Sequence, residues 1–358
     1  MIKSKDISIV VQGPISEGTK LSTQSIRKYL PDATIILSTW EGSDTESLDY
    51  DELLLNKDPG SFVCCKEINA NTNINRQLVS TQNGLNLVKT KYAMKLRSDL
   101  YLTNNSFLEY FDKFSISDEK MFFVKHRMIT SSLTSKRYSD APNRRYCLLP
   151  FHLSDWFMFG LTEDIRDYYS TLLIEDEKTF SDYPFKYLER NPVPTFTFRY
   201  APEQFFCYSW LKRHYTNFSF EDWTDWNEEN QRLYEKIIAN NFIVLDTIQH
   251  GMYSKKHFDF INDNDGESFE FDGYISHLYF SKLYKKYCDK TYKIPSKYFL
   301  IEDKFANKTA ARLKKAKVKF ARKKYLKLFD IVFYASLLTI LKLKIALSNL
   351  VLSKEDVK

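Results

Sequence analysis

The sequence brings an arginine and an acid together in a strand-like segment. Residues 92–102 are predicted to form a strand that carries Lys95, Arg97 and Asp99. A carboxylate at the carboxyl end of a buried parallel strand can hold a divalent cation, Mn²⁺ or Mg²⁺, against a diphosphate. The alternative role for Asp99 is a turn residue that pairs with Arg97. The sequence leaves both roles open.

Two further acids stand where segments of regular structure begin. Asp155 comes directly before an apolar strand-like run, residues 156–159, and is either a general base or a turn residue. Glu203 follows Pro202 at the start of a helix predicted over residues 202–215. There it either binds a sugar hydroxyl or complements the helix dipole. Asp155 and Glu203 are therefore the candidate catalytic carboxylates.

Amide, guanidinium and imidazole groups form a second set of candidates. Asn75 and Arg76 open the helix predicted over residues 73–89, and such a helix start suits an anion or a nucleotide. Ordinary helix capping is the alternative. His250 precedes Gly251 and is either a metal ligand or a hydrogen-bonded structural residue.

The elements that must position these groups alternate along the first hundred residues. Residues 7–11, 34–40 and 53–55 are apolar runs typical of buried strands. Helical patterns cover residues 22–30 and 73–89. Strands that alternate with helices predict βαβ units, a largely parallel sheet and an α/β fold class.

Polar clusters occupy the ends of these predicted strands. Ligands of largely parallel sheets bind beyond the carboxyl ends of the strands, near the point where the strand order reverses. We therefore expect three clusters to converge at one edge of the sheet: Gln12-Gly13-Pro14, Thr39-Trp40-Glu41 and Arg97-Ser98-Asp99.

The second half of the chain is less regular. Residues 121–124, 156–159 and 242–245 are predicted as strands, and residues 202–215 as a helix. Residues 216–240 mix aromatic residues with acids and give no clear pattern.

Composition and motifs exclude several classes of protein. Hydrophobic residues make up 43% and aromatic residues 16% of the 358 positions, which excludes a disordered chain. The sequence contains no P-loop, GxGxxG, HExxH or GxSxG motif. These absences argue against P-loop NTPases, ordinary Rossmann dehydrogenases, zinc proteases and α/β-hydrolases.

The net charge of +6 is distributed unevenly. Residues 304–327 contain 11 Lys and Arg and no acid, and the last 31 residues add one more positive charge, which leaves residues 1–303 at −6. We therefore predict a globular domain over residues 1–303 and a basic, amphipathic helical tail over residues 304–358. The acidic balance of the globular domain argues against binding to nucleic acid.

The tail is expected to lie on a membrane surface. Its apolar run, residues 331–341, is shorter than the roughly 20 residues that a spanning helix needs, so an interfacial helix on an anionic leaflet fits better.

Residues 1–6 lead into the first strand without an apolar signal-peptide core. Five cysteines without a CxxC spacing favour reduced thiols. We expect a cytoplasmic protein that is peripheral on the inner face of the plasma membrane.

Taken in order, several of these stretches resemble the WavE lipopolysaccharide-synthesis family. They are residues 7–14 (ISIVVQGP), 35–42 (IILSTWEG), 58–60 (DPG), 73–77 (NINRQ) and 95–100 (KLRSDL). The similarity is densest before residue 102. It implies a glycosyltransferase with a GT-A-like fold for nucleotide-diphospho-sugars, which is a Rossmann-like mixed sheet, acting in surface polysaccharide assembly.

The resemblance also implies roles for individual residues. It places the nucleotide-sugar site on Gln12, Gly13, Pro14, Trp40, Asn75, Arg76, Arg97 and Asp99. The triplet Arg97-Ser98-Asp99 stands where GT-A enzymes have an Asp-x-Asp metal motif. With an arginine in place of the first acid, Asp99 alone holds a metal less firmly, and Arg97 can neutralise the charge of the leaving group. Asp99 and His250 are the candidate metal ligands.

These observations predict an enzyme that moves a sugar from a nucleotide-sugar donor to a hydroxyl of a lipopolysaccharide or capsule glycan, with a lipid-linked acceptor at the membrane. Two alternatives stay open: a sugar-phosphate or polyol-phosphate transferase on a similar fold, and a non-enzymatic membrane-surface scaffold. Release of free nucleotide from a donor distinguishes the enzymes from the scaffold. Phosphate in the product distinguishes the two enzymes.

Truncation at Asp303 tests the role of the tail. Each basic residue near an anionic leaflet contributes about 1 kcal/mol, and salt screens this attraction. We expect the truncated protein to fold and to bind its donor, but to lose binding to anionic liposomes. Cosedimentation with anionic and neutral liposomes across a salt series measures the difference. Equal binding of the full chain to both liposomes, or a truncated protein that does not fold, contradicts the prediction.

Overall fold

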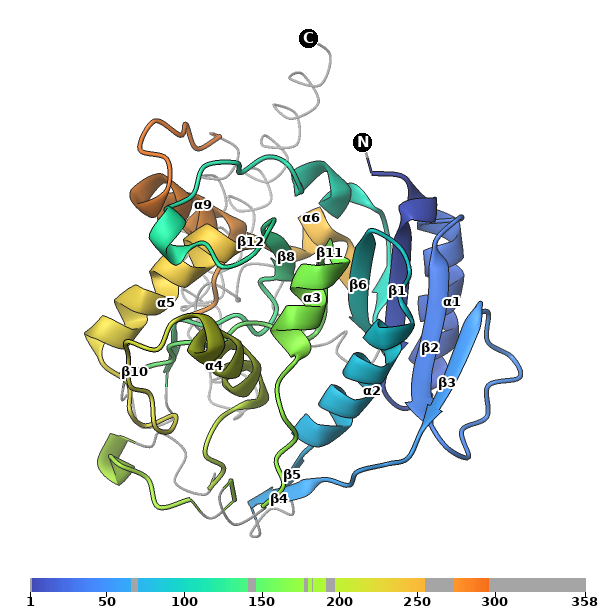
Figure 1. The fold of residues 1–358 in the computed structure, drawn as a ribbon, viewed down its shortest axis with the longest axis horizontal. Coiled ribbons are helices and arrows are strands. Elements are labelled where there is room, and N and C mark those ends of the chain that lie inside the picture. The colour runs from blue at the N-terminus through green and yellow to red at the C-terminus, as the bar shows by residue number, and fades with distance from the viewer. Residues whose placement is uncertain are drawn as a thin grey trace, which may run out of the picture.

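The computed structural model describes residues 2–65, 70–140, 146–176, 180–181, 183–190, 197–254 and 273–295. The predicted tail, residues 304–358, lies outside the described residues. Within them, the chain forms a mixed α/β structure around one large sheet (Figure 1). The α/β class is therefore confirmed.

The large sheet has seven strands, in the order β12-β8-β11-β6-β1-β2-β3. All neighbouring strands are parallel except for β11, which is antiparallel to both β6 and β8. The sheet is thus largely parallel, as predicted. In chain order the strands are β1 (Ile7–Gln12), β2 (Thr34–Trp40), β3 (Glu52–Asn56), β6 (Tyr92–Arg97), β8 (Met128–Ser131), β11 (Phe157–Leu161) and β12 (Phe242–Leu245).

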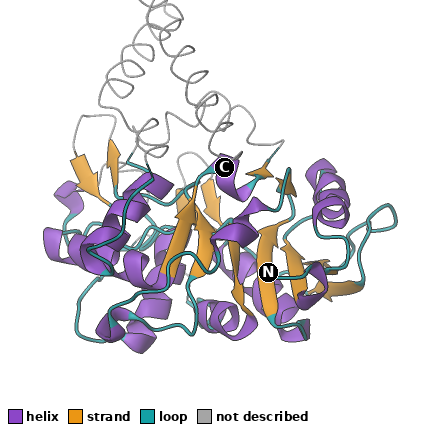
Figure 2. Cartoon of the chain, turned by 90° about the horizontal axis from the view of Figure 1, so that it is seen from above, coloured by secondary structure: helices purple, strands orange, loops and turns teal. Residues whose placement is uncertain are grey.

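Helices cover both faces of this sheet, which is why every residue of β1 is buried. In Figures 1 and 2, α2 and α3 lie on one face and α1 lies on the other. The α-helices are α1 (Glu17–Tyr29), α2 (Ile74–Leu87), α3 (Thr162–Tyr169), α4 (Pro202–His214), α5 (Glu228–Asn241), α6 (Thr247–His250) and α9 (His277–Tyr287). None of the helices in the described ranges combines the length and the apolar character that crossing a membrane requires.

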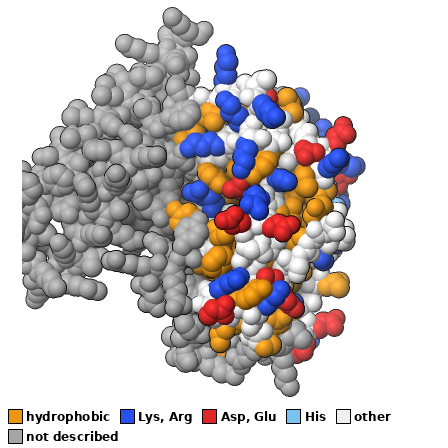
Figure 3. All heavy atoms as spheres, turned by 90° about the vertical axis from the view of Figure 1, so that its left-hand side faces the viewer, with side chains coloured by type: hydrophobic (Ala, Val, Ile, Leu, Met, Phe, Trp, Pro, Cys, Tyr) orange, Lys and Arg blue, Asp and Glu red, His pale blue; other side chains and the backbone are white. Residues whose placement is uncertain are grey.

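Small elements surround the large sheet. Three two-stranded sheets pair β4 (Phe62–Cys65) with β5 (Ala70–Thr72), β7 (Tyr101–Leu102) with β13 (Met252–Tyr253), and β9 (Tyr138–Asp140) with β10 (Tyr146–Leu148). Short 3₁₀ helices span Ser4–Asp6, Ser106–Tyr110, Glu119–Met121 and Leu188–Arg190. On the side of the molecule where α5 lies, basic and acidic side chains alternate on the surface (Figure 3).

The prediction of a strand over residues 121–124 is wrong. A 3₁₀ helix ends at Met121, and the backbone N–H of Phe123 donates to the side chain of Asn241 rather than to a neighbouring strand. The strand of this region is β8, seven residues further on. Among the helices in the described ranges, four had no counterpart among the predictions: α3, α5, α6 and α9.

Helix α2 packs closely on β1 and β2 because it has a glycine at the contact. A Cβ atom at Gly84 would lie 2.4 Å from Cγ1 of Val10 and 3.3 Å from Cβ of Ser38. Four residues earlier in α2, the carbonyl oxygen of Ser80 accepts a hydrogen bond from the Ser38 hydroxyl at 2.7 Å. The helix therefore cannot move away from the sheet without breaking this hydrogen bond.

We expect Gly84→Ala to lower the free energy of unfolding by about 1–3 kcal/mol, because overpacking at this contact outweighs the better helix propensity of alanine. Urea unfolding measures the change. Asn86→Ala is the matched control, since Asn86 is exposed on the same helix. A Gly84→Ala protein as stable as the wild type would contradict the close packing.

Candidate functional site

The strand order reverses between β1 and β6. The chain passes from β1 to β2 and β3, and then returns to the other side of β1 as β6. Gln12 and Arg97 are register partners at the carboxyl ends of these two strands, and Gln12 also pairs with Ser38 of β2. The predicted polar clusters thus do converge at one edge, and this edge is the switch point where ligands of such sheets bind.

The turn after β1 is bonded to both neighbouring strands. Gly13 has a φ of +118°, a conformation that side-chain-bearing residues rarely adopt, and its N–H donates to the Ser38 carbonyl at 3.1 Å. The Ser98 hydroxyl donates to the carbonyl of Pro14 at 2.7 Å. Trp40 ends β2 beside this turn and is half-buried. The turn is therefore a fixed backbone surface at the switch point.

Arg97 is held between an acid and an aromatic ring. Its Nε and Nη2 atoms donate to the two carboxylate oxygens of Asp99 at 3.0 and 2.7 Å. Its guanidinium carbon lies 4.5 Å from the ring centre of Trp156. The Arg97 side chain is 23% exposed, so a ligand can still reach it. The pairing of Asp99 with Arg97 is the alternative role that the sequence left open.

The two candidate metal ligands have other hydrogen-bond partners in this arrangement. Both oxygens of Asp99 accept hydrogen bonds from Arg97. His250 is fully buried, with Nε2 2.9 Å from the Ser131 hydroxyl and Nδ1 accepting from the N–H of Met252 at 3.0 Å. Burial lowers the pKa of His250 to about 3. No group of three His, Cys, Asp or Glu side chains suited to a metal occurs in the described part of the chain. A cation at Asp99 and His250 stays a prediction.

The start of α2 has structural bonds of its own. The side-chain amide of Asn75 donates to the Ile174 carbonyl at 2.8 Å and accepts from the Ile174 N–H at 2.9 Å, which holds the loop after α3. Arg76 makes a bidentate ion pair with Asp58, with both distances 2.7 Å. The contact of Asn75 and Arg76 with a nucleotide therefore stays a prediction.

A buried cation lies beside the switch point. Lys95 of β6 is fully buried, and its ammonium group donates to the backbone carbonyl of Asp155. Burial lowers the pKa of Lys95 to about 8, and the negative charge of Asp155 opposes this shift. Lys95 therefore stays largely protonated at pH 7. The sequence analysis placed Lys95 in this strand but assigned no function to it.

Asp155 and Glu203 meet beside this lysine. Asp155 is 3% exposed, and its Oδ1 atom is buried without a hydrogen-bond partner among the described residues. Glu203 is the second residue of α4, with a side chain 14% exposed. Burial, and then the negative charge of Asp155, raise the pKa of Glu203 well above its usual range. The two predicted catalytic carboxylates thus form one electrostatically coupled pair.

A histidine that sequence reasoning did not select faces this pair. Nε2 of His152 lies 3.8 Å from Oε2 of Glu203, and Nδ1 lies 2.8 Å from the carbonyl oxygen of Thr134. The only sequence signal was its position three residues before Asp155. The site therefore combines a guanidinium, a carboxyl pair, a buried ammonium and an imidazole at one edge of the sheet.

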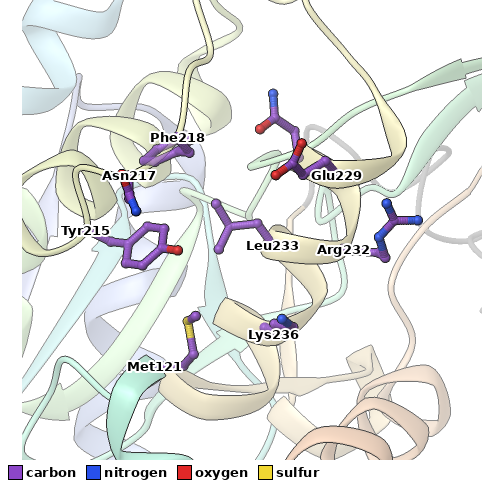
Figure 4. A pocket seen from close by; sticks show the side chains of 9 residues that line it. Met121, Tyr215, Asn217, Phe218, Glu229, Arg232, Leu233 and Lys236 are labelled. Carbon is purple, nitrogen blue, oxygen red and sulfur yellow. The ribbon is translucent and has the colours of Figure 1, made fainter.

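A shallow cavity of about 300 Å³ lies elsewhere (Figure 4). Tyr215, Phe218, Leu233 and Lys236 are among its lining residues. Tyr215 follows the C-terminal end of α4, whereas Glu203 is at its start, so a 13-residue helix of about 20 Å separates the cavity from the carboxyl pair. The cavity is not part of the candidate site.

The raised pKa of Glu203 predicts how stability depends on pH. Because the pKa of Glu203 is higher in the folded than in the unfolded state, this group stabilises the folded state fully at pH values below about 4.5, the ordinary glutamate pKa. That stabilisation is lost as the pH rises through the pKa of the folded state. Glu203→Gln removes that dependence. We expect the variant to gain stability over the wild type between pH 5 and 8 by at least about 1.4 kcal/mol, the equivalent of one pKa unit. Urea unfolding at several pH values, with exposed Glu229→Gln as control, measures this. Parallel pH profiles of wild type and Glu203→Gln would contradict the prediction.

The family relationship agrees with the resemblance noted in the sequence. A family model described as WavE lipopolysaccharide synthesis matches residues 7–318, which include the β1–β6 switch point and the carboxyl pair. No curated protein matches the chain. Because the match extends over most of its length, the chain belongs to the WavE lipopolysaccharide synthesis family.

Proposed function

We propose that this protein is a glycosyltransferase of the GT-A type, which moves a sugar from a nucleotide-sugar donor to a hydroxyl of a lipopolysaccharide or capsule glycan. The observation that supports this most is the coupled pair of Asp155 and Glu203 beside Arg97 at the switch point. Membership of a lipopolysaccharide-synthesis family and a mixed sheet with one antiparallel strand agree with it.

Arg97 is the cation for the leaving group. When the bond between the anomeric carbon and the diphosphate breaks, negative charge develops on the phosphate oxygens, and a fixed positive group stabilises that charge. The planar guanidinium suits phosphate oxygens as well as it suits a carboxylate. The diphosphate then competes with Asp99 for the same N–H groups. Gln12 and Gly13, on the neighbouring strand end, face the nucleotide part of the donor.

Asp155 is the general base. The acceptor hydroxyl oxygen forms a bond to the anomeric carbon while the carbon–oxygen bond to the diphosphate breaks, and the hydroxyl proton passes to the Asp155 carboxylate. The buried ammonium group of Lys95 donates to the backbone carbonyl of Asp155 and so holds this residue in place. A single displacement of this kind inverts the configuration at the anomeric carbon.

Glu203 is the protonated member of the pair. Two neighbouring buried carboxyl groups resist ionising together, so one of them retains its proton. The environment raises the pKa of Glu203, which assigns the proton to this residue. A neutral Glu203 donates a hydrogen bond to a sugar oxygen and leaves proton abstraction to Asp155.

The basic tail, residues 304–358, is proposed to hold the enzyme on the inner face of the plasma membrane. Eleven basic residues between 304 and 327 support attraction to an anionic leaflet. A lipid-linked acceptor would then meet the enzyme in two dimensions.

A screen of nucleotide-sugars tests the function. A true donor raises the melting temperature by mass action. With the donor found in this way, we expect Asp155→Asn to lower kcat by about 10²–10⁴-fold while the affinity for the donor stays close to that of the wild type.

Asp112→Asn is the control, because Asp112 is an exposed acid far along the chain from Asp155. Unchanged kcat in Asp155→Asn at saturating substrates would show that Asp155 is a structural turn residue. A chain that neither binds nor turns over any nucleotide-sugar would contradict the function itself.

A further inference from the structure

The side chains of His152 and Glu203 face each other in the candidate site, with 3.8 Å between Nε2 and Oε2. We propose that the two side chains bind one hydroxyl group of a sugar substrate between them: Nε2 of His152 accepts the hydroxyl hydrogen, and the Glu203 carboxyl donates to the hydroxyl oxygen. This inference rests on the proposed function, because the ligand is a sugar.

The tautomer of His152 is fixed by its other ring nitrogen. Nδ1 lies 2.8 Å from the carbonyl oxygen of Thr134, and a carbonyl only accepts, so Nδ1 carries the hydrogen. Nε2 therefore presents a lone pair toward Glu203. Burial and the positive charge of Lys136 lower the pKa of His152 to about 3, so the ring stays neutral. Such an imidazole accepts a hydrogen bond but does not take up a proton at neutral pH.

The spacing fits one bridging atom. The 3.8 Å between Nε2 of His152 and Oε2 of Glu203 is too long for a direct hydrogen bond. An oxygen atom about 2.8 Å from each fits beside this gap. A hydroxyl both donates and accepts, and so matches a lone pair on one side and a protonated carboxyl on the other. The two side chains are 11% and 14% exposed, so a small part of each can still be reached by a substrate.

Strained backbone holds the imidazole in place. Thr134 and Phe151 have φ angles of +65° and +63°, the left-handed region that non-glycine residues, and β-branched ones above all, avoid. Thr134 supplies the carbonyl that orients His152, and Phe151 directly precedes it. The Lys136 N–H also donates to the His152 carbonyl at 2.8 Å. Strain of this kind persists where the surrounding structure over-determines it, and it concentrates at functional sites.

The histidine belongs to the same chain segment as the proposed catalytic base. His152 is three residues before Asp155, the proposed base, and Trp156 of the same segment packs on Arg97. A sugar held at His152 is thus bound by the same short segment that carries the proposed base and the tryptophan packed on the proposed leaving-group cation. The hydroxyl belongs either to the donor sugar or to the acceptor sugar, and the same chemistry serves both.

Two substitutions separate recognition from folding. His152→Asn keeps an amide donor where Nδ1 bonds to Thr134 but has no atom at the Nε2 position. His152→Gln keeps a polar atom near the Nε2 position and rescues part of the recognition. The control is His214→Gln, because His214 ends α4, 11 residues from Glu203.

The experiment compares each sugar with its monodeoxy analogues. The probes are the UDP-, GDP-, TDP- and CMP-sugars that the wild type binds, with calorimetric titration for donors, and acceptor glycosides in the transfer assay. For one hydroxyl, we expect the wild type to prefer the parent sugar over the deoxy analogue by at least about tenfold. In His152→Asn this ratio falls to nearly one, in His152→Gln it is intermediate, and in His214→Gln it equals that of the wild type. A loss in the donor titration assigns the hydroxyl to the donor, and a loss only in kcat/KM for acceptors assigns it to the acceptor.

The inference is overturned if folded His152→Asn keeps the wild-type ratio for every hydroxyl, or weakens parent and deoxy sugars equally. These outcomes differ from failure of the proposed function, in which the wild type neither binds nor transfers any nucleotide-sugar. In that case, ligand-observed NMR with free hexoses and their deoxy forms compares wild type and His152→Asn. Equal binding of all of them by both proteins then overturns the hydroxyl site as well.

Discussion

The buried charge of Lys95 is the constraint on which the candidate site depends. An ammonium group without solvent contact is costly unless neighbouring groups compensate for it. Its hydrogen bond to the Asp155 carbonyl holds the segment before β11 against β6, and the nearby carboxylates supply the opposing charge. The same interaction therefore fixes the position of Asp155. Loss of the lysine would leave that carboxylate buried without compensation.

One buried cation cannot balance two buried carboxylates, and this imbalance divides the roles of the acids. Asp155 is the carboxylate whose backbone is bonded to Lys95, while burial and the charge of Asp155 raise the pKa of Glu203. Beside them, burial and the positive charge of Lys136 lower the pKa of His152 and keep the ring neutral. In the proposed mechanism, one edge of the sheet thus offers a base, a neutral hydrogen-bond donor and a neutral acceptor. These groups come from one short segment and from the start of α4. Such a set suits a sugar, whose hydroxyl groups both donate and accept hydrogen bonds.

Most of the fold up to residue 102 was predictable, because apolar strands and amphipathic helices alternate there and the switch point follows from topology. Asp155 and Glu203 were also predicted individually as candidate catalytic residues, because each stands where a strand or a helix begins. Their coupling was not predictable, because 48 positions separate them and only the tertiary fold brings the start of α4 to the segment before β11, where the Gln204 side chain donates to the Pro150 carbonyl. His152 lies in a loop without periodicity. Helix α5 was missed because aromatic and acidic residues obscure the start of its helical pattern.

Under the proposed function, the orientation of Arg97 accounts for how a site with a single acid at this strand end could bind a diphosphate. A flexible cation must lose side-chain freedom when it binds a ligand, and this loss weakens binding. Here Asp99 holds the guanidinium in a bidentate pair and Trp156 supports one of its faces before any ligand arrives. A diphosphate that takes over the N–H groups of Arg97 exchanges one anion for another without reordering the cation. Because a group positioned in advance stabilises developing charge at little reorganisation cost, the pairing of Arg97 with Asp99 is compatible with a role in catalysis as well as in structure.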